Sequence, residues 1–211
     1  MIGSTATLAI AASRARALWL PACALVFLSV AAGAGSNILQ TSSVRIVSNV
    51  VFTALVAIAV AYLNGRAMRN DPFAAVEEAA PLFGRQWARA NAIFPTAVVL
   101  LCSAAQYAVP LWLRDHAALT FFAINAIAAL TALPIALSVP LRSQWNGVLY
   151  AALSIVGALF CTAFGAAMLQ ATRNGAIAVS ASAGLALILV FLALRQYGEA
   201  LARYDPVPRV T

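Results

Sequence analysis

Residues 17 to 34 read ALWLPACALVFLSVAAGA, an apolar run with no charged residue that is as long as a membrane-crossing helix. A helix rises about 1.5 Å per residue, so roughly 20 such residues cover about 30 Å of hydrocarbon. The 211-residue chain is 64% hydrophobic and 9% charged, with a mean hydropathy of +0.92. Soluble domains carry roughly 25% charged residues, so the composition indicates an integral membrane protein.

Similar apolar runs recur along the whole chain and predict an all-α protein. Six transmembrane helices are expected, because in hydrocarbon the backbone must satisfy its own hydrogen bonds. Residues 1 to 12 are expected to form a short helix lying along the membrane interface. The whole chain, 1–211, is one transmembrane domain with spans at about 17–35, 46–63, 92–113, 117–141, 147–169 and 176–197.

The thirteen arginines set the expected orientation, since the chain contains no lysine. With the N-terminus inside, cytoplasmic segments hold ten arginines and the outside loops only three, which are Arg45, Arg114 and Arg173. Basic residues favour cytoplasmic loops, so both termini are expected in the cytoplasm. This pattern favours a multi-pass protein of a bacterial-type cytoplasmic membrane. The net charge of +7 then reflects orientation, and no nucleic-acid partner is expected.

One long polar interruption separates the second and third expected spans. It reads NGRAMRNDPFAAVEEAAPLFGRQWARANA over residues 64 to 92. Asp71 and Pro72 form a helix start signal, because Asp is a favoured N-cap and Pro suits the first helical position. Pro81 disfavours helix at the preceding residue, so the chain is expected to bend there and restart into the third span. The segment 64–91 is therefore predicted to contain an amphipathic cytoplasmic helix joined at a corner to a transmembrane helix.

This helix and corner between the second and third of six spans resemble the coupling-helix region of type-2 ABC exporter permeases. The resemblance implies a permease subunit that works with a separate ATPase subunit and with a second permease copy or homologous subunit. ATP and Mg would bind that ATPase, because this chain has no Walker motif, and the chain itself would not be an enzyme. The residues expected to contact the ATPase are Phe73, Val76, Glu77, Glu78, Phe83, Arg85, Trp87 and Arg89. The alternative for this segment is an interfacial helix that contacts membrane lipid.

Few other residues indicate chemistry, so no catalytic residue, bound cofactor or metal site is predicted. A lone His116 cannot build a zinc site by itself, and the three cysteines lie inside apolar runs. No ionisable residue lies in the middle of any expected span, which counts against a proton-driven or ion-driven carrier. The polar residues at depth are expected to form interhelical hydrogen bonds, and they are Gln106, Asn125, Thr131, Ser154, Thr162 and Ser182. A substrate path past Gln106 and Asn125 is the alternative, and it suits an apolar or amphipathic cargo.

Small residues recur at every fourth position in the last two expected spans. They are Gly157, Cys161 and Gly165 in the fifth, and Ala176, Ser180 and Gly184 in the sixth. This spacing places them on one helix face and lets two backbones approach closely. Packing within the chain is the first expectation and a dimer seam the second. For the protein as a whole, the alternative to an exporter permease is a non-transporting accessory or scaffold subunit of a membrane complex.

Overall fold

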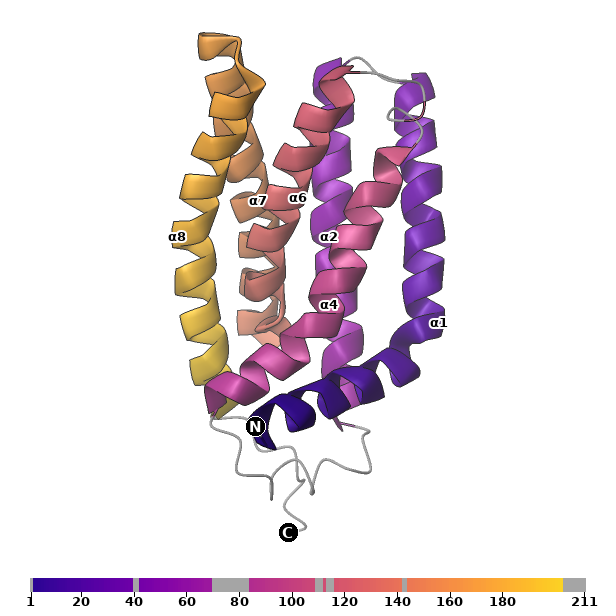
Figure 1. Ribbon diagram of the computed structural model, residues 1–211, viewed down its shortest axis with the longest axis vertical. Coiled ribbons are helices and arrows are strands. Elements are labelled where there is room, and N and C mark those ends of the chain that lie inside the picture. Colours follow the sequence, from indigo (N-terminus) through magenta and orange to yellow (C-terminus); the bar gives the residue numbers. More distant parts are fainter. Residues whose placement is uncertain are drawn as a thin grey trace.

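The protein is an antiparallel bundle of long helices (Figure 1). The computed structural model describes the backbone of residues 2–39, 42–69, 84–108, 112, 116–141 and 144–202. It describes the side chains of residues 12–35, 44–68, 91–108, 112, 119–141 and 145–200. Within these ranges nearly every residue is helical and there is no strand.

The helices are long compared with those of soluble proteins. They are α1 (Ile2–Leu39), α2 (Ser42–Arg69), α4 (Gly84–Gln106), α6 (His116–Ala136), α7 (Gln144–Thr172) and α8 (Gly175–Ala202), with the short 3-10 helix η1 (Val139–Leu141) after α6. Within the described part of the chain, five stretches are long and apolar enough to cross a membrane: Ala12–Gly35, Val44–Met68, Leu119–Leu141, Trp145–Thr172 and Gly175–Ala200. The prediction of an all-helical, multi-pass membrane protein is therefore supported. The apolar section of α4, Asn91–Gln106, is shorter than these five.

The first helix differs from its prediction because α1 runs without interruption from Ile2 to Leu39. Residues 2 to 12 belong to this helix and form no separate one. The first part of α1 crosses the lower end of the bundle obliquely before the helix turns upward (Figure 1). Pro21 lies inside α1 and accounts for the bend, since it lacks the donor for one helix bond and its ring presses on the preceding turn. Pro95 lies inside α4, which changes direction in a similar way.

The polar interruption is partly helical in the structure. α2 continues to Arg69, so residues 64–69 extend the second helix beyond the predicted end at 63. α4 begins at Gly84 and ends at Gln106, earlier than the predicted end at 113. The predicted helix start at Asp71 and the corner at Pro81 lie outside the described residues.

The fourth predicted span, 117–141, is divided into two pieces. α6 ends at Ala136, and a turn leads into η1. The amide of Leu137 still bonds to the carbonyl of Leu133, but the amide of Ser138 shifts to the carbonyl of Ile135. Pro140 explains why the α-helix stops, because it cannot donate a bond to the carbonyl of Ala136. The helix therefore ends at Ala136, two residues after Pro134.

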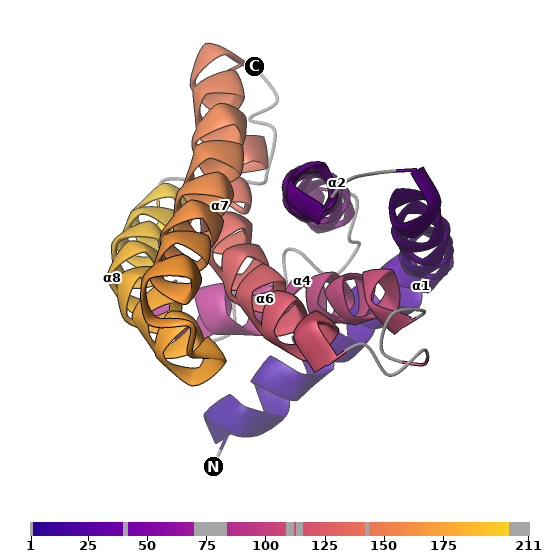
Figure 2. The same cartoon turned by 90° about the horizontal axis from the view of Figure 1, so that it is seen from above.

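Three helices form the centre of the bundle. α2, α4 and α6 pack on one another, α1 packs mainly on α4, and α7 and α8 pack on α6 (Figure 2). Both α2 and α6 carry fully buried alanines that belong to the same core cluster, among them Ala54, Ala57, Ala128 and Ala132. Small side chains let the two backbones approach closely, which is the main source of helix packing energy in a membrane.

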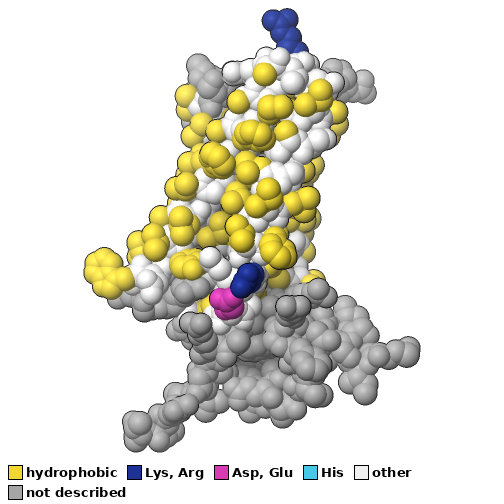
Figure 3. All heavy atoms as spheres, turned by 90° about the vertical axis from the view of Figure 1, so that its left-hand side faces the viewer, with side chains coloured by type: hydrophobic (Ala, Val, Ile, Leu, Met, Phe, Trp, Pro, Cys, Tyr) yellow, Lys and Arg dark blue, Asp and Glu magenta, His cyan; other side chains and the backbone are white. Residues whose placement is uncertain are grey.

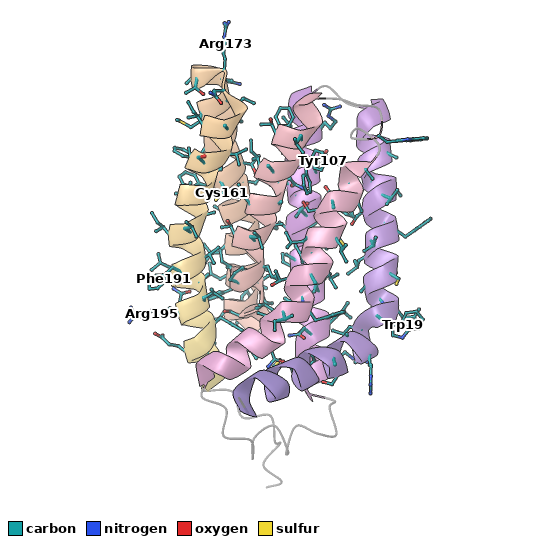
Figure 4. All side chains as sticks on the ribbon, in the orientation of Figure 1. Trp19, Tyr107, Cys161, Arg173, Phe191 and Arg195 are labelled. Carbon is teal, nitrogen blue, oxygen red and sulfur yellow. The ribbon has the colours of Figure 1, made fainter. Side chains whose placement is uncertain are left out.

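Large apolar side chains point outward from the outer helices. Figure 3 shows a face on which hydrophobic side chains cover most of the helix length, with charged side chains toward the two ends. Phe191 of α8 is 70% exposed and Trp145 of α7 is 86% exposed. Figure 4 shows Phe191 and Trp19 projecting away from the bundle. Such a surface is suited to lipid tails.

A two-residue turn joins α7 to α8 at the far end of the bundle, opposite the end at which α1 begins. Arg173 has a φ of 52°, in the left-handed region that is common just after a helix. The Asn174 side chain accepts a hydrogen bond from the Ala176 amide at 2.9 Å and caps α8. The turn leaves α7 and α8 antiparallel, so α8 ends at the same end of the bundle at which α1 begins (Figure 1).

Candidate functional site

Four buried polar side chains meet where α2, α4 and α6 pack together. We call this group the central cluster, and it consists of Thr53, Ser103, Gln106 and Asn125. Gln106 Nε2 donates to Thr53 Oγ1 at 2.8 Å. Asn125 Nδ2 donates to Thr53 Oγ1 at 3.1 Å and to Ser103 Oγ at 3.0 Å. Thr53 Oγ1 in turn donates to Asn125 Oδ1 at 3.3 Å.

One atom of the central cluster has no hydrogen-bond partner. Gln106 is only 1% exposed, yet its carbonyl oxygen Oε1 is one of three such unpaired buried side-chain atoms in the described part of the chain. An unpaired buried acceptor costs about 1–3 kcal/mol, so each one in a folded protein requires an explanation. The central cluster therefore contains an acceptor that is ready to bind a further donor.

Neighbouring residues of α1 and α4 close the central cluster on one side. Gly33 of α1 packs directly against the Gln106 backbone, where any Cβ would collide with the Gln106 carbonyl. One turn earlier on α1, Ser29 hydrogen-bonds with the Cys102 side chain of α4. Tyr107 follows Gln106 and lies in the upper half of the bundle (Figure 4), with its ring centroid 6.0 Å from that of Phe122. The central cluster is thus walled by α1 as well as by the three central helices.

A second polar group lies at the lower end of the bundle, where α1 begins and α8 ends. We call it the base cluster, and it contains Arg14, Asn64, Asn91 and Tyr197. The Arg14 side chain is 2% exposed, and its Nε donates to Asn91 Oδ1 at 3.3 Å. Its Nη1 donates to the carbonyl of Ala67 at 3.4 Å. Tyr197 of α8 is buried and lies near enough to Arg14 for an electrostatic interaction.

The base cluster joins the two helices that flank the polar interruption. Asn64 near the end of α2 donates from Nδ2 to the Asn91 carbonyl of α4 at 3.4 Å. Arg14 bridges the same two helices through Ala67 and Asn91. A buried arginine is costly unless its donors are paired. Arg14 therefore links α1 to the ends of α2 and α4 that border the polar interruption.

An apolar belt separates the two clusters. On α2, Thr53 and Asn64 are eleven positions apart, which corresponds to about 16 Å along the helix axis. The buried residues between them are Val56, Ala57, Val60 and Ala61, and α4 contributes Val98, Val99 and Cys102. A polar molecule would lose its hydrogen bonds in this belt, whereas an apolar one would not.

The chemistry available in the central cluster is recognition by neutral hydrogen-bonding groups. Its four side chains are amides and hydroxyls, which bind donors and acceptors without carrying a net charge. Among the described residues, no group of three or more His, Cys, Asp or Glu is placed to hold a metal ion. The arrangement is a buried network of neutral hydrogen-bonding groups between three helices.

The structure describes only some of the predicted site residues. Gln106 and Asn125, predicted as an alternative substrate path, come together through Thr53. Arg85, Trp87 and Arg89 fall in the first two turns of α4, but their side chains lie outside the described ones. The remaining residues of the predicted ATPase contact also lie outside the described residues, and they are Phe73, Val76, Glu77, Glu78 and Phe83.

The small residues of α7 face the interior of the bundle. Gly157 packs toward Ile135 of α6, and Gly165 packs toward Ser182 of α8. Cys161 is fully buried, with its sulfur 3.6 Å from Thr131 Oγ1. In α8, Ala176, Ser180 and Gly184 are exposed, and Gly184 has no neighbouring atom within 4 Å of an added Cβ. A dimer seam along α8 stays a prediction.

All four hydroxyls that were expected to link helices bond within their own helix, and Thr131 of α6 also makes the expected contact between helices, with the Cys161 sulfur of α7 at 3.6 Å. Thr131, Ser154, Thr162 and Ser182 each donate to a backbone carbonyl three or four residues earlier. The reason is that a hydroxyl in a helix can reach that carbonyl, whereas the longer amides of Gln106 and Asn125 reach across.

Sequence reasoning overlooked Thr53 and Ser103 of the central cluster, and it counted Arg14 only as a flanking charge. Its other omissions were Asn64 and Asn91, the two asparagines that bound the polar interruption. The available signal was a polar residue inside an apolar run.

Comparisons with protein-family models, with curated proteins and with solved structures found no match for this chain.

Proposed function

We propose that the chain is the permease subunit of an ATP-driven exporter of the ABC type. It would cross a bacterial-type cytoplasmic membrane six times, with α4 as the third span and both termini in the cytoplasm. The central cluster is the observation that carries this proposal. Three helices from different parts of the chain bring an unpaired buried acceptor and its polar neighbours to one point inside the bundle. A transport site requires side chains that bind the cargo at one place within the membrane.

The arrangement of the clusters supports an apolar or amphipathic cargo. The central cluster binds polar groups, the apolar belt accepts hydrocarbon, and the base cluster offers polar contacts at the proposed cytoplasmic end. A molecule with polar and apolar parts would therefore have matching side chains in the central cluster, in the apolar belt and in the base cluster. A purely ionic cargo would lose its hydration in the apolar belt and would find no opposite charge there to offset that cost.

Energy for the movement would enter at the segment between α2 and α4. The ends of this segment are held by the base cluster, through Asn64 and Ala67 on α2 and Asn91 on α4. An ATPase subunit that pushes on residues 70–83 would act on both helices at once, and through Arg14 on α1. Rigid-body rocking of packed helices is an established means of alternating access.

A second candidate is a non-transporting accessory or scaffold subunit. It is favoured by the same bonds that link α1, α2 and α4 at the base, because a scaffold benefits from fixed helices. In that case the polar segment would be a docking helix only, and no cycle of ATP hydrolysis would depend on it.

The test is purification of the full-length tagged chain from its own membranes in mild detergent, followed by measurement of ATP hydrolysis. We expect a vanadate-sensitive activity that copurifies with a Walker-motif subunit. The double variant Glu77→Arg with Glu78→Arg is expected to lose it. Glu199→Arg is the matched control, because it makes the same change at an exposed position of α8. A membrane-inserted chain without copurifying ATPase activity would contradict the exporter and favour the scaffold.

A further inference from the structure

The unpaired oxygen of Gln106 indicates the class of molecule that the central cluster binds. We propose that Gln106 Oε1 accepts a hydrogen bond from a neutral donor, a hydroxyl or amide group, carried by an otherwise apolar molecule. The inference rests on the proposed function where it names that molecule as the cargo. The site itself is argued from the geometry of the four side chains.

The partner must be a donor because the other polar atoms around Gln106 are already paired. Gln106 Nε2 is used by Thr53, and both atoms of the Asn125 amide are used by Thr53 and Ser103. The Gln106 Oε1 acceptor remains without a partner although its residue is 1% exposed. A carbonyl oxygen can accept two hydrogen bonds and can donate none. Only a group with an O–H or N–H satisfies it.

The donor must be neutral because the central cluster carries no charge. Its amides and hydroxyls can solvate a dipole, but a cation would enter the bundle without a counter-charge. Burying an unpaired charge costs several kcal/mol even after relaxation. A hydroxyl or amide has no such cost, and it gains the bond that Gln106 lacks.

The remainder of the molecule must be largely apolar because most buried side chains around the central cluster are apolar, with Asn49 and Ser29 as the polar exceptions. Val50 and Ala54 precede and follow Thr53 on α2, and Ile124 precedes Asn125 on α6. Toward the base lies the apolar belt, and toward the far end lie the tilted rings of Tyr107 and Phe122. One donor group on a hydrocarbon body matches this distribution.

Gln106 lies buried at the end of α4, so a ligand would reach its Oε1 only by displacing the side chains around it. Figure 1 shows that the upper end of α4 lies below the upper ends of α1, α2 and α6. Gln106 is the last residue of α4, and the amide of Tyr107 bonds to the Ala104 carbonyl in a tighter turn. The acceptor therefore sits at a helix end inside the bundle, where the regular backbone bonding of α4 stops.

The test uses the full-length chain in phosphatidylcholine nanodiscs, with glutamine labelled by carbon-13 in the side-chain carbonyl. The probes are octanol and its methyl ether, which share an apolar body but differ in the donor. Infrared difference spectra report the labelled carbonyl directly. Octanol is expected to move part of the band to lower frequency, because a hydrogen bond weakens the carbonyl bond, and the ether is expected to leave the band in place.

Two variants assign the signal. Gln106→Leu is expected to abolish the octanol shift. Gln196→Leu is expected to retain it, because Gln196 lies on α8 and its oxygen already accepts from the Tyr150 hydroxyl at 3.1 Å. Equal spectra with octanol and ether in the unmodified chain would overturn the inference, as would a shift that survives Gln106→Leu. Gln106→Met replaces the leucine variant should the latter fail to fold.

The result is separable from the test of the exporter. An octanol shift at Gln106 without copurifying ATPase activity would support ligand binding at Gln106 and contradict the proposal of an ATP-driven exporter. ATPase activity without the octanol shift would keep the exporter and reject this class of cargo.

Discussion

Replacing Asn125 by leucine should destabilise the bundle by about 2 kcal/mol. The two side chains have the same number and branching of heavy atoms, so the change chiefly removes polar contacts. Asn125 takes part in three hydrogen bonds, two with Thr53 and one with Ser103. Hydrogen bonds between helices in membranes average about 0.6 kcal/mol each. Three of them give about 1.8 kcal/mol, and the hydroxyls left unpaired add to the cost.

A double-mutant cycle isolates one of these bonds. Ser103→Ala removes the 3.0 Å contact with Asn125 Nδ2 and should cost about 0.6 kcal/mol. In the double variant this bond is lost only once, so the two effects should fall short of additivity by about the same amount. Unfolding in mixed micelles with an increasing fraction of dodecyl sulfate, followed by circular dichroism, measures each free energy.

Thr162→Val is the control for the loss of a buried polar group. Thr162 donates only to the Ala158 carbonyl of its own helix, so its replacement should change the free energy of unfolding by less than about 0.5 kcal/mol. An Asn125→Leu cost no larger than that of Thr162→Val would refute the interhelical network. Strict additivity with Ser103→Ala would refute the Asn125–Ser103 bond.

Three further predictions concern packing and helix ends. Gly33→Ala should destabilise the bundle by about 1–3 kcal/mol because the new methyl meets the backbone of α4, whereas Gly35→Ala on the same helix meets no atom within 4 Å and should not destabilise it. Arg14→Leu should cost about 1–3 kcal/mol, because it removes the buried bonds from Arg14 to the Asn91 side chain and to the Ala67 carbonyl, with the same micelle assay as readout. Asn174→Ala should remove the cap of α8 and cost about 1 kcal/mol. Comparing the unfolding midpoint of the variant with that of the unmodified chain measures this cost.

The overall architecture could be predicted from the sequence because it depends on the length of apolar runs. The stretch around Phe191 is apolar on every side, and only a helix satisfies its backbone in hydrocarbon. Boundaries were less accurate where one residue decides them. α6 stops at Ala136 because of Pro140, and α1 continues through residues 2 to 12 although two arginines follow them.

The central cluster could be predicted only in part. Gln106 and Asn125 are conspicuous because an amide is expensive in hydrocarbon. Thr53 is not, since a threonine in a helix usually bonds to its own backbone, as Thr131 does. Whether a hydroxyl bonds to the backbone of its own helix or to a side chain of a neighbouring helix depends on which helices pack together. That pairing, α2 with α4 and α6, is a tertiary property that no local pattern contains.

The base cluster illustrates the same limit for charge. Counting arginines predicts an orientation in the membrane, and Arg14 contributes to that count like any other arginine. Its burial depends on the bend of α1, which brings the helix under α4 and next to Asn91. A long arginine side chain at the end of a span can reach toward water or toward the bundle with equal ease. Only the packing of α1 on α4 decides between them.

Access to the central cluster from water during an ATP cycle tests the transport proposal most directly. The measurement is the reactivity of Thr53→Cys with a charged, membrane-impermeant thiol reagent, with Cys23, Cys102 and Cys161 replaced by alanine. Thr162→Cys serves as the control inside the bundle. We predict that inverted vesicles label Thr53→Cys at rates that differ severalfold between the ATP-free and the vanadate-trapped state. Equal labelling of Thr53→Cys in both states, at the level of Thr162→Cys, would contradict the proposal.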